Sequence, residues 1–395
     1  MNILLLIDVL PPKYSGLTLR MEIIFNELKK FHKVYFLYLG NKKIEGDERE
    51  ILEKFCTKIM TFPLKRKQFI WGRIWNVLSF KHGAYAPFKF REDYDSVRKQ
   101  IQAYICEFNI ELIHVFGCFT AQYVKDINEI PKLWDLADSY SLDIKRQLAT
   151  APLLSKFGLF LCGIRLFNYE TEIIRKMSKT IFVSQIDADV YKGVVASEKI
   201  IVIPNGVDLD YFSAQQTVKE DYPSLIFTGH MSFPPNIEAV DFFIGNVFQI
   251  VKRQIPDVKL YIVGSDVNNR ILKYNKSDAI IITGAVDDIR VFLDKATVFV
   301  NPMISGCGIK NKLLQAMAMK KPVVSTSLGA EAVQAQDGVD FMIADNANDF
   351  ANKIIELLGS DTKRLVMGEN ARKTVEKNYN WQDKLVVYKQ LYDGL

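Results

Sequence analysis

Cysteine and histidine are scarce in this chain of 395 residues, which has five cysteines and four histidines. The cysteines are odd in number and form no CxxC pair, and the histidines are not spaced as metal ligands. This argues against a disulfide framework and a zinc site, and it favours a reducing compartment. No apolar run reaches membrane-spanning length, and the apolar start at 1–8 lacks the positive region of a secretory signal. We expect a cytoplasmic protein whose first residues form a buried strand.

Acidic residues are absent from the stretch 62–91, although charged residues make up an ordinary 25% of the chain. This stretch interleaves seven basic residues with Phe, Trp and Tyr, and the shorter segment 153–167 places Lys156 and Arg165 among Phe and Leu. Such segments favour contact with an anionic membrane, at the inner face of the cytoplasmic membrane; the alternative is a folded excursion that packs onto its domain. Nucleic-acid binding fits poorly, because no RNA or DNA motif accompanies the charge.

Short β-branched runs alternate with segments of helical period through most of the chain. The expected strands are 3–9, 34–39, 112–116, 132–136, 180–184, 200–203, 225–228, 259–263, 280–283, 298–301 and 322–325. The expected helices include 18–31, 93–106, 236–254 and 381–391. This alternation predicts an α/β protein with parallel sheets covered on both faces.

One open sheet of so many strands would be unusual, so we expect two doubly wound, Rossmann-like domains facing a cleft. A turn signal at 204–206 opens a polar stretch that ends at Pro223. We therefore predict an N-terminal domain at 1–205, a linker at 206–222 and a C-terminal domain at 223–378. Residues 379–395 should form a separate amphipathic helix.

The segment 305–318, SGCGIKNKLLQAMA, is the most informative motif. The strand at 298–301 runs into a turn broken by glycines, and a helix is expected from near Ile309, with Lys310 and Lys312 in its first turn. Free N–H groups near Gly308, the helix N-terminus and two lysines would hold a phosphate or diphosphate. Gln315, one turn further on, could reach a sugar hydroxyl. The alternative is an ordinary strand-to-helix turn with solvated lysines.

Several short motifs in a fixed order extend this interpretation. They are NGVDLDYF at 205–212, FTGHM at 227–231, PN at 235–236, IVG at 262–264, TGAVDD at 283–288 and GIKNKLLQAMA at 308–318. Together they resemble the retaining GT-B glycosyltransferases of family 4, and most closely the bacterial exopolysaccharide-cluster transferases of the PEP-CTERM/exosortase-associated type. The resemblance implies transfer of a sugar from a nucleoside diphosphate sugar to a hydroxyl of a lipid-linked bacterial surface glycan. It implies no cofactor, an acceptor-side N-terminal domain, and a helix at 379–395 that returns to that domain.

The resemblance also implies roles for individual residues. The residues implied to hold the donor diphosphate are Gly16, Arg20, His230, Gly308, Lys310 and Lys312. The residues implied to hold the nucleoside are Val286 and Gln315. Asp135 and His114 are the catalytic candidates. Structural alternatives stand beside them: a strand-to-helix turn with a solvated arginine, helix capping by Asp138 and Ser139, and a satisfied core histidine at 114.

The chain departs from the family's pattern after the first strand of the C-terminal domain, where His230 and Pro235 stand near the usual arginine and lysine, and again in the motif 305–318. Cys307 and Gln315 occupy the places of the usual glutamate pair, whose carboxylates would accept strong hydrogen bonds from ribose hydroxyls. Two alternatives therefore stay open: a weak or inactive relative acting as a binding or scaffolding subunit, and a GT-B sugar-nucleotide 2-epimerase. No Asp-rich metal motif is visible, so we expect a metal-independent enzyme in which Lys310, Lys312 and Arg20 neutralise the diphosphate.

Overall fold

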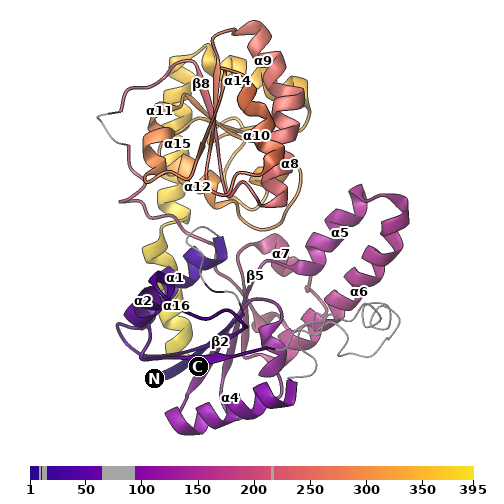
Figure 1. The fold of residues 1–395 in the computed structure, drawn as a ribbon, viewed down its shortest axis with the longest axis vertical. Coiled ribbons are helices and arrows are strands. Elements are labelled where there is room, and N and C mark those ends of the chain that lie inside the picture. Colours follow the sequence, from indigo (N-terminus) through magenta and orange to yellow (C-terminus); the bar gives the residue numbers. More distant parts are fainter. Residues whose placement is uncertain (9, 11–15, 65–93, 215–217) are drawn as a thin grey trace. The chain divides into compact units, whose positions relative to one another are not determined.

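The computed structural model describes residues 1–395 except 9, 11–15, 65–93 and 215–217. The described chain forms two compact units, which we call the N-terminal domain (Met1–Ile203 with Leu385–Leu395) and the C-terminal domain (Pro204–Lys384). Each contains one parallel sheet covered by helices (Figure 1). The predicted loop 11–15 before Gly16, and all of the stretch 62–91 after residue 64, lie outside the described residues.

The N-terminal domain is built on a seven-stranded sheet of order β3-β2-β1-β4-β5-β6-β7, in which every neighbouring pair is parallel. Its strands are β1 (Asn2–Ile7), β2 (Lys33–Leu39), β3 (Lys58–Phe62), β4 (Leu112–Phe116), β5 (Lys132–Ala137), β6 (Lys179–Phe182) and β7 (Ile200–Val202). Its helices are α1 (Gly16–Leu28), α2 (Asp47–Phe55), α4 (Tyr94–Phe108), α5 (Tyr140–Thr150), α6 (Leu153–Lys176) and α7 (Gln185–Asp189), with 3₁₀ turns at Thr120–Tyr123 and Ser197–Lys199.

The C-terminal domain repeats this plan with a six-stranded parallel sheet of order β10-β9-β8-β11-β12-β13. Its strands are β8 (Ser224–Thr228), β9 (Lys259–Val263), β10 (Ile280–Gly284), β11 (Val298–Asn301), β12 (Val323–Ser325) and β13 (Met342–Ile343). Its helices are α8 (Pro234–Phe242), α9 (Gln249–Gln254), α10 (Asn269–Leu272), α11 (Ile289–Lys295), α12 (Asn311–Ala318), α13 (Ser327–Ala330), α14 (Ala347–Leu358) and α15 (Asp361–Asn378). A π-helical segment, Phe243–Phe248, joins α8 to α9.

The strand β1 shows why these apolar runs become central strands. Ile3 and Leu5 enter one hydrophobic cluster, whereas Leu4 and Leu6 enter another, because successive side chains point to opposite faces of a sheet. A strand that is apolar on both faces is stable only when helices cover both faces. The sequence prediction of an α/β fold with two doubly wound parallel sheets is therefore confirmed.

Both sheets have a topological switch point next to their first strand. The chain builds outward from β1 to β3 and then continues on the other side of β1 with β4; β8 and β11 hold the same relation in the C-terminal domain. The loops after two such strands leave in opposite directions, and ligands bind at the carboxyl ends of these strands in folds of this class. The loops after β8 and β11 are those that carry the motifs FTGHM and GIKNK.

The last helix, α16 (Trp381–Asp393), is divided between the two domains, since Leu385–Leu395 belongs to the N-terminal one. Tyr388 and Tyr392 pack in the same cluster as Ile3 and Phe25, so α16 covers the face of the first sheet that α1 also covers. The apolar residues that recur at helical spacing in α16, namely Trp381, Leu385, Tyr388 and Tyr392, are therefore buried.

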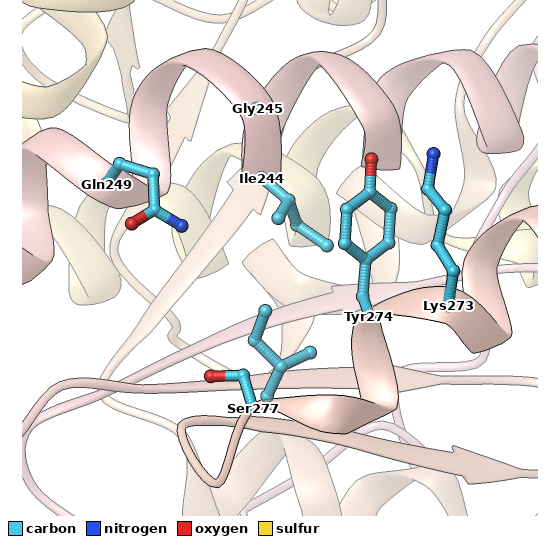
Figure 2. Close-up of a pocket in the computed structure, with 7 residues that line it drawn as sticks. Ile244, Gly245, Gln249, Lys273, Tyr274 and Ser277 are labelled. Carbon is cyan, nitrogen blue, oxygen red and sulfur yellow. The ribbon is translucent and has the colours of Figure 1, made fainter.

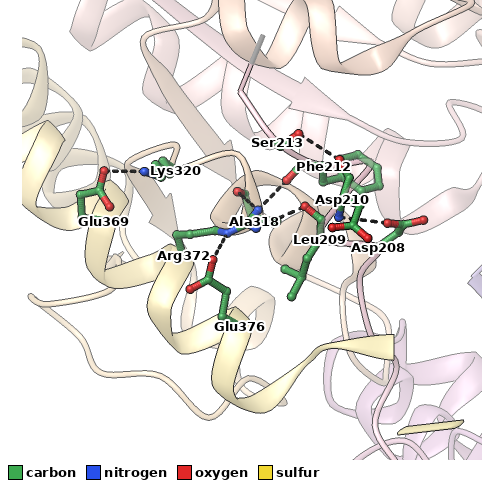
Figure 3. Close-up of polar contacts among 10 residues, drawn as sticks. All are labelled: Asp208, Leu209, Asp210, Phe212, Ser213, Ala318, Lys320, Glu369, Arg372 and Glu376. Atoms are coloured by element: carbon green, nitrogen blue, oxygen red, sulfur yellow. Dashed lines mark hydrogen bonds and ion pairs between the residues drawn. The ribbon is translucent and has the colours of Figure 1, made fainter. Parts of the chain in front are cut away.

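The segment after Pro204 is bound tightly within the C-terminal domain. The Arg372 guanidinium on α15 donates to the carbonyl oxygens of Phe212 (2.7 Å), Ala318 (2.8 Å) and Leu209 (3.2 Å), as Figure 3 shows. Its Nε also donates to Glu376 (2.6 Å). One side chain thereby joins α15, the end of α12 and residues 209–212, which the sequence suggested as part of a linker.

Three local features differ from the sequence expectations. Two short edge strands, β3 and β13, were not expected; β13 has only two residues, too few for a recognisable alternation. The helix expected at 236–254 begins at Pro234 and contains the π-helical segment. The helix expected near Ile309 begins later, at Asn311, so Lys310 occupies its N-cap position and is not in the first turn.

Candidate functional site

The loop between β11 and α12, predicted to bind a diphosphate, turns on two glycines. Gly306 and Gly308 have positive φ angles of 99° and 66°, a region that residues with a Cβ avoid. These two glycines let the chain turn sharply into α12. The Lys310 carbonyl oxygen accepts from the N–H of Leu313 (2.8 Å), but the Lys310 side chain at the N-cap has no acceptor with which to cap the helix. This end of α12 is therefore suited to an anionic partner.

Lys310 folds back over this loop. Its Nζ donates to the carbonyl oxygens of Cys307 (2.5 Å) and Gly308 (3.0 Å), and the residue is buried. The ammonium therefore sits among the loop's own backbone groups and not in bulk solvent. An ammonium held there adds positive charge next to the helix N-terminus.

Lys312 lies in the first turn of α12 and points into the domain. Its Nζ donates to Asn236 Oδ1 (2.5 Å) and lies 4.0 Å from the centroid of the Phe227 ring. Burial, and then the charge of Lys310, lowers the pKa of Lys312 well below its ordinary value. An anionic ligand would supply the counter-charge that favours the protonated form.

Asn236 joins the two loops at the switch point. Its Nδ2 donates to the carbonyl oxygen of His230 (2.9 Å), while its Oδ1 accepts from Lys312. A Cβ at Gly229 would lie 2.7 Å from Asn236 Nδ2 and 3.2 Å from Lys312 Nζ, so a larger residue there would displace these two side chains. The sequence prediction included Asn236 only as part of the PN motif. The signal that could have indicated a buried polar contact is its position in the first turn of a largely apolar helix.

A second contact ties the loop to α8. Ser305 donates to the Glu238 carboxylate, and a Cβ at Gly306 would lie 3.5 Å from Pro235. Neither Ser305 nor Glu238 was predicted as a site residue. Their pairing depends on the fold, since 67 positions separate them in the chain.

His230 follows β8, as predicted, and its ring is held from both sides. Nδ1 lies 3.1 Å from Ser265 Oγ and 3.2 Å from Asp266 Oδ2, and Nε2 lies 2.8 Å from Ser232 Oγ. The structure thus brings the His230 loop together with Gly308, Lys310 and Lys312 at one switch point. Its role toward a diphosphate stays a prediction.

Val286 and Gln315, the predicted nucleoside contacts, are both partly buried. Val286 follows β10, whose last residue, Gly284, accepts a hydrogen bond from the N–H of Gly264 (3.1 Å). Gln315 lies on α12, one turn beyond Lys312. Both positions adjoin the carboxyl ends of strands, and both roles stay predictions.

The N-terminal domain holds the other predicted residues, and two of them form a buried ion pair. Arg20 Nε lies 3.0 Å from Asp135 Oδ2, and both side chains are fully enclosed. Tyr388 donates to Asp135 Oδ2 (2.5 Å) and accepts from Arg20. Burial alone would lower the pKa of Arg20, but Asp135 and Tyr388 raise it above its ordinary value.

This environment bears on the predicted roles of Arg20 and Asp135. Arg20 is not the solvated arginine of the structural alternative, since its guanidinium is enclosed by α16 and β5. Neither side chain faces solvent. Their ion pair, with the hydrogen bonds to Tyr388, links α1, β5 and α16. Their roles toward the donor and in catalysis stay predictions. Gly16 begins α1, next to residues that are not described.

His114 is a fully buried residue of β4. Its Nδ1 lies 2.5 Å from the Tyr392 hydroxyl, and Nε2 has no hydrogen-bond partner among the described residues. Burial, assisted by the charge of Arg20, lowers the pKa of His114 to about 3. The imidazole is therefore neutral near neutral pH. Ser139, in turn, caps α5 by accepting from the N–H of Leu142, as the capping alternative predicted.

Other features of the surface do not add to this site. Among the described residues, no three His, Cys, Asp or Glu side chains gather as metal ligands, and no helix is long and apolar enough to cross a bilayer. An open pocket of about 340 Å³ lies beside the π-helical segment, lined by Gln249, Lys273 and Tyr274 (Figure 2). It also contacts Ile280, the first residue of β10, so it lies at the amino end of that strand and away from the switch-point loops.

Comparison with known proteins shows which protein families the sequence resembles. Residues 222–360 match the family described as Glycosyl transferases group 1. Over 165 residues, the chain is 29% identical to an uncharacterized 44.6 kDa protein in the cps region of Klebsiella pneumoniae, covering 40% of this chain and 42% of that protein. Over 202 residues, it is 29% identical to an uncharacterized glycosyltransferase of Methanocaldococcus jannaschii, covering 50% and 54%. The chain thus spans about half the length of these curated relatives or less.

Solved structures resemble the whole chain. Sucrose-phosphate synthase from Thermosynechococcus elongatus matches 100% of this chain and 99% of its own, with a TM-score of 0.72 and 18% identity. Anabaena HepE, solved in complex with UDP, matches 100% of both chains, with a TM-score of 0.71 and 14% identity. The chain therefore has the fold of the GT-B glycosyltransferases. Within that fold, the segment that is similar to the group 1 glycosyl transferases, 222–360, lies in the second domain.

Proposed function

We propose that this protein is a glycosyltransferase that moves a sugar from a nucleoside diphosphate sugar to a hydroxyl of a bacterial surface glycan. The observation that carries the proposal is the loop with Gly308, Lys310 and Lys312 at the switch point of the segment that matches the group 1 family. Breaking the glycosidic bond to a diphosphate places negative charge on the leaving group. The Lys310 ammonium, Lys312 once the bound anion has raised its pKa, and the first N–H groups of α12 would stabilise that charge.

The finer features of this proposal come from the resemblance and from the neighbours. We propose a retaining, metal-independent reaction of the family 4 type and a lipid-linked acceptor. HepE has been solved in complex with UDP-glucose as well as with UDP, so UDP is the first nucleotide to test. The relative in a cps region supports a product in polysaccharide synthesis.

The test begins with binding. The protein should unfold at a higher temperature with one of UDP, GDP, ADP or CMP, because a ligand that binds the native state stabilises it. Lys312→Met should weaken that nucleotide at least about tenfold, since a charge-assisted hydrogen bond contributes roughly 1.5–3 kcal/mol. Lys320→Met is the matched control: it removes a lysine that is exposed and paired with Glu369 beyond the end of α12. No stabilisation by any nucleotide, or equal binding by the two variants, would overturn the proposal.

A second candidate, a weak or inactive relative that binds without turnover, is favoured by Cys307 and Gln315 in place of acidic residues. Release of the nucleoside diphosphate from the matching sugar nucleotide separates the two. Steady release by the wild type supports the enzyme. Binding without release, with release gained in Gln315→Glu, supports the inactive relative. An epimerised donor formed without an acceptor would instead indicate the 2-epimerase.

A further inference from the structure

The helical hairpin of α5 and α6 presents an apolar stripe that the described residues of its domain leave exposed. Figure 1 shows these two helices extending away from the sheet of the N-terminal domain, packed against each other. Four large side chains of α6 are exposed to unusual degrees: Leu153 by 84%, Phe157 by 71%, Phe160 by 51% and Ile164 by 45%. Phe side chains are normally among the more buried in a folded protein.

These four residues form one continuous stripe. Their spacing of four, three and four positions places them on one face of a helix. Gly158 adds no bulk to the hairpin surface, since a Cβ there would meet nothing within 4 Å. The face of α6 toward α5 is marked by Gly163, where a Cβ would lie 3.4 Å from Ile144. The stripe is therefore not the seam of the hairpin.

The charge along the hairpin is mostly positive. Between Ser139 and Asn168 the basic residues are Lys145, Arg146, Lys156 and Arg165, and the single acidic residue is Asp143. An apolar face bordered by cations matches a surface that is itself apolar beneath a layer of anionic groups.

We propose that the α5–α6 hairpin docks this protein on the surface of an anionic lipid bilayer, with the Leu153–Phe157–Phe160–Ile164 stripe inserted among the headgroups and acyl chains. Lys145 and Lys156 contact lipid phosphates beside the stripe. The hairpin lies on the bilayer and does not cross it, because no helix of the described chain is suited to span one. This inference rests on the proposed function in one respect: a docked protein would meet the proposed lipid-linked acceptor at the bilayer surface.

The test uses the full-length protein and sedimentation with vesicles, without any nucleotide or acceptor. Wild type should bind vesicles of equal parts phosphatidylglycerol and phosphatidylcholine. The double variant Phe157→Ser with Phe160→Ser should bind at least about tenfold more weakly, since each inserted ring contributes a large apolar area. The double variant Lys145→Glu with Lys156→Glu should lose about fivefold or more for each lysine.

The matched control is Leu365→Ser with Val366→Ser, which removes two apolar side chains of α15 that are exposed by 71% and 57%. It should bind vesicles as the wild type does. Equal binding by the Phe157 and Phe160 variant would show that another segment, such as 62–91, makes the contact, and would overturn the proposal. So would equal binding to vesicles of phosphatidylcholine alone, or a dimer in solution that this variant dissociates.

The result is separate from that of the proposed function. Vesicle binding needs no sugar nucleotide, and release of a nucleoside diphosphate in solution needs no vesicle. Vesicle binding without turnover would support the docking surface and contradict the proposed enzymatic function. Turnover without vesicle binding would support the enzymatic function and contradict the docking surface.

Discussion

At the scale of single residues, Lys312 gives the most direct consequence for pH. Because the pKa of Lys312 is depressed in the free protein, a bound diphosphate should raise it, and binding should take up a proton. The affinity for UDP, or for whichever nucleotide binds, should therefore rise as pH falls from about 10.4, the ordinary pKa of lysine.

The variant Lys312→Arg provides the contrast, because a guanidinium stays charged throughout this range. Its affinity should depend less on pH than that of the wild type, and titration calorimetry in two buffers should show less proton uptake. An equally steep dependence in Lys312→Arg would mean that another group, such as Lys310 or the nucleotide phosphate itself, takes up the proton.

Glu170 is a second residue whose pKa predicts a measurable effect. It accepts from Tyr191 (2.7 Å) and from the N–H groups of Tyr140 (3.0 Å) and Ser141 (3.3 Å), yet burial raises its pKa to about 7. An acid with a raised native pKa keeps its proton when the unfolded chain has lost it. The free energy of unfolding should therefore fall as pH rises from about 4.5 to 7, by about 3 kcal/mol from this group.

Urea unfolding of the wild type and of Glu170→Gln at several pH values measures this contribution. The glutamine variant should lack the decline, so its difference from the wild type should grow in its favour with rising pH. His114 acts in the opposite direction, because its pKa of about 3 makes the native state lose stability below about pH 6.5. A difference that does not change with pH would show that Glu170 has an ordinary pKa.

At the scale of elements, α16 depends on one buried polar group. Arg20 from α1, Asp135 from β5 and the Tyr388 hydroxyl meet with no access to solvent. Asp135→Asn would leave the guanidinium buried without its counter-charge, which should cost about 3–5 kcal/mol of unfolding free energy. Tyr388→Phe, which removes only the hydroxyl, should cost about 1–2 kcal/mol.

Unfolding and turnover measured on the same Asp135→Asn protein separate a structural role from a catalytic one. A destabilised variant whose folded fraction still releases the nucleoside diphosphate would support the structural role. Unchanged stability with lost turnover would restore the catalytic prediction for Asp135.

The elements also show what sequence patterns can and cannot reveal. Central strands such as β1 and β4 were predictable because all of their residues except Asn2 and His114 are apolar, and α16 because Trp381, Leu385 and Tyr388 keep helical spacing. The partners inside the site were not. Asn236 with Lys312, and Ser305 with Glu238, pair only because the switch point places the loops after β8 and β11 side by side. The predicted start of α12 near Ile309 is two residues too early. The sequence alone does not reveal that Gly308 adopts a positive φ, which keeps the chain out of the helix at that point.

At the scale of the whole molecule, the proposed chemistry predicts independence from divalent metal. The positive charge at the candidate donor site comes from Lys310, Lys312 and the N-terminus of α12. Release of the nucleoside diphosphate after dialysis against EDTA should stay within about twofold of the untreated rate. Complete loss, recovered with Mg²⁺ or Mn²⁺, would contradict this; Lys320→Met treated in parallel controls for handling.

The division of α16 between the domains has a consequence for the order of synthesis. Arg20 and Asp135 leave the ribosome early, but Tyr388 follows only after the entire second domain has been made. Domains are generally expected to fold as units in the order of translation. Here the face of the first sheet that Tyr388 and Tyr392 cover stays uncovered until the second domain and α16 have been synthesised. A nascent chain stalled before residue 385 should therefore be a better client for chaperones than the released protein.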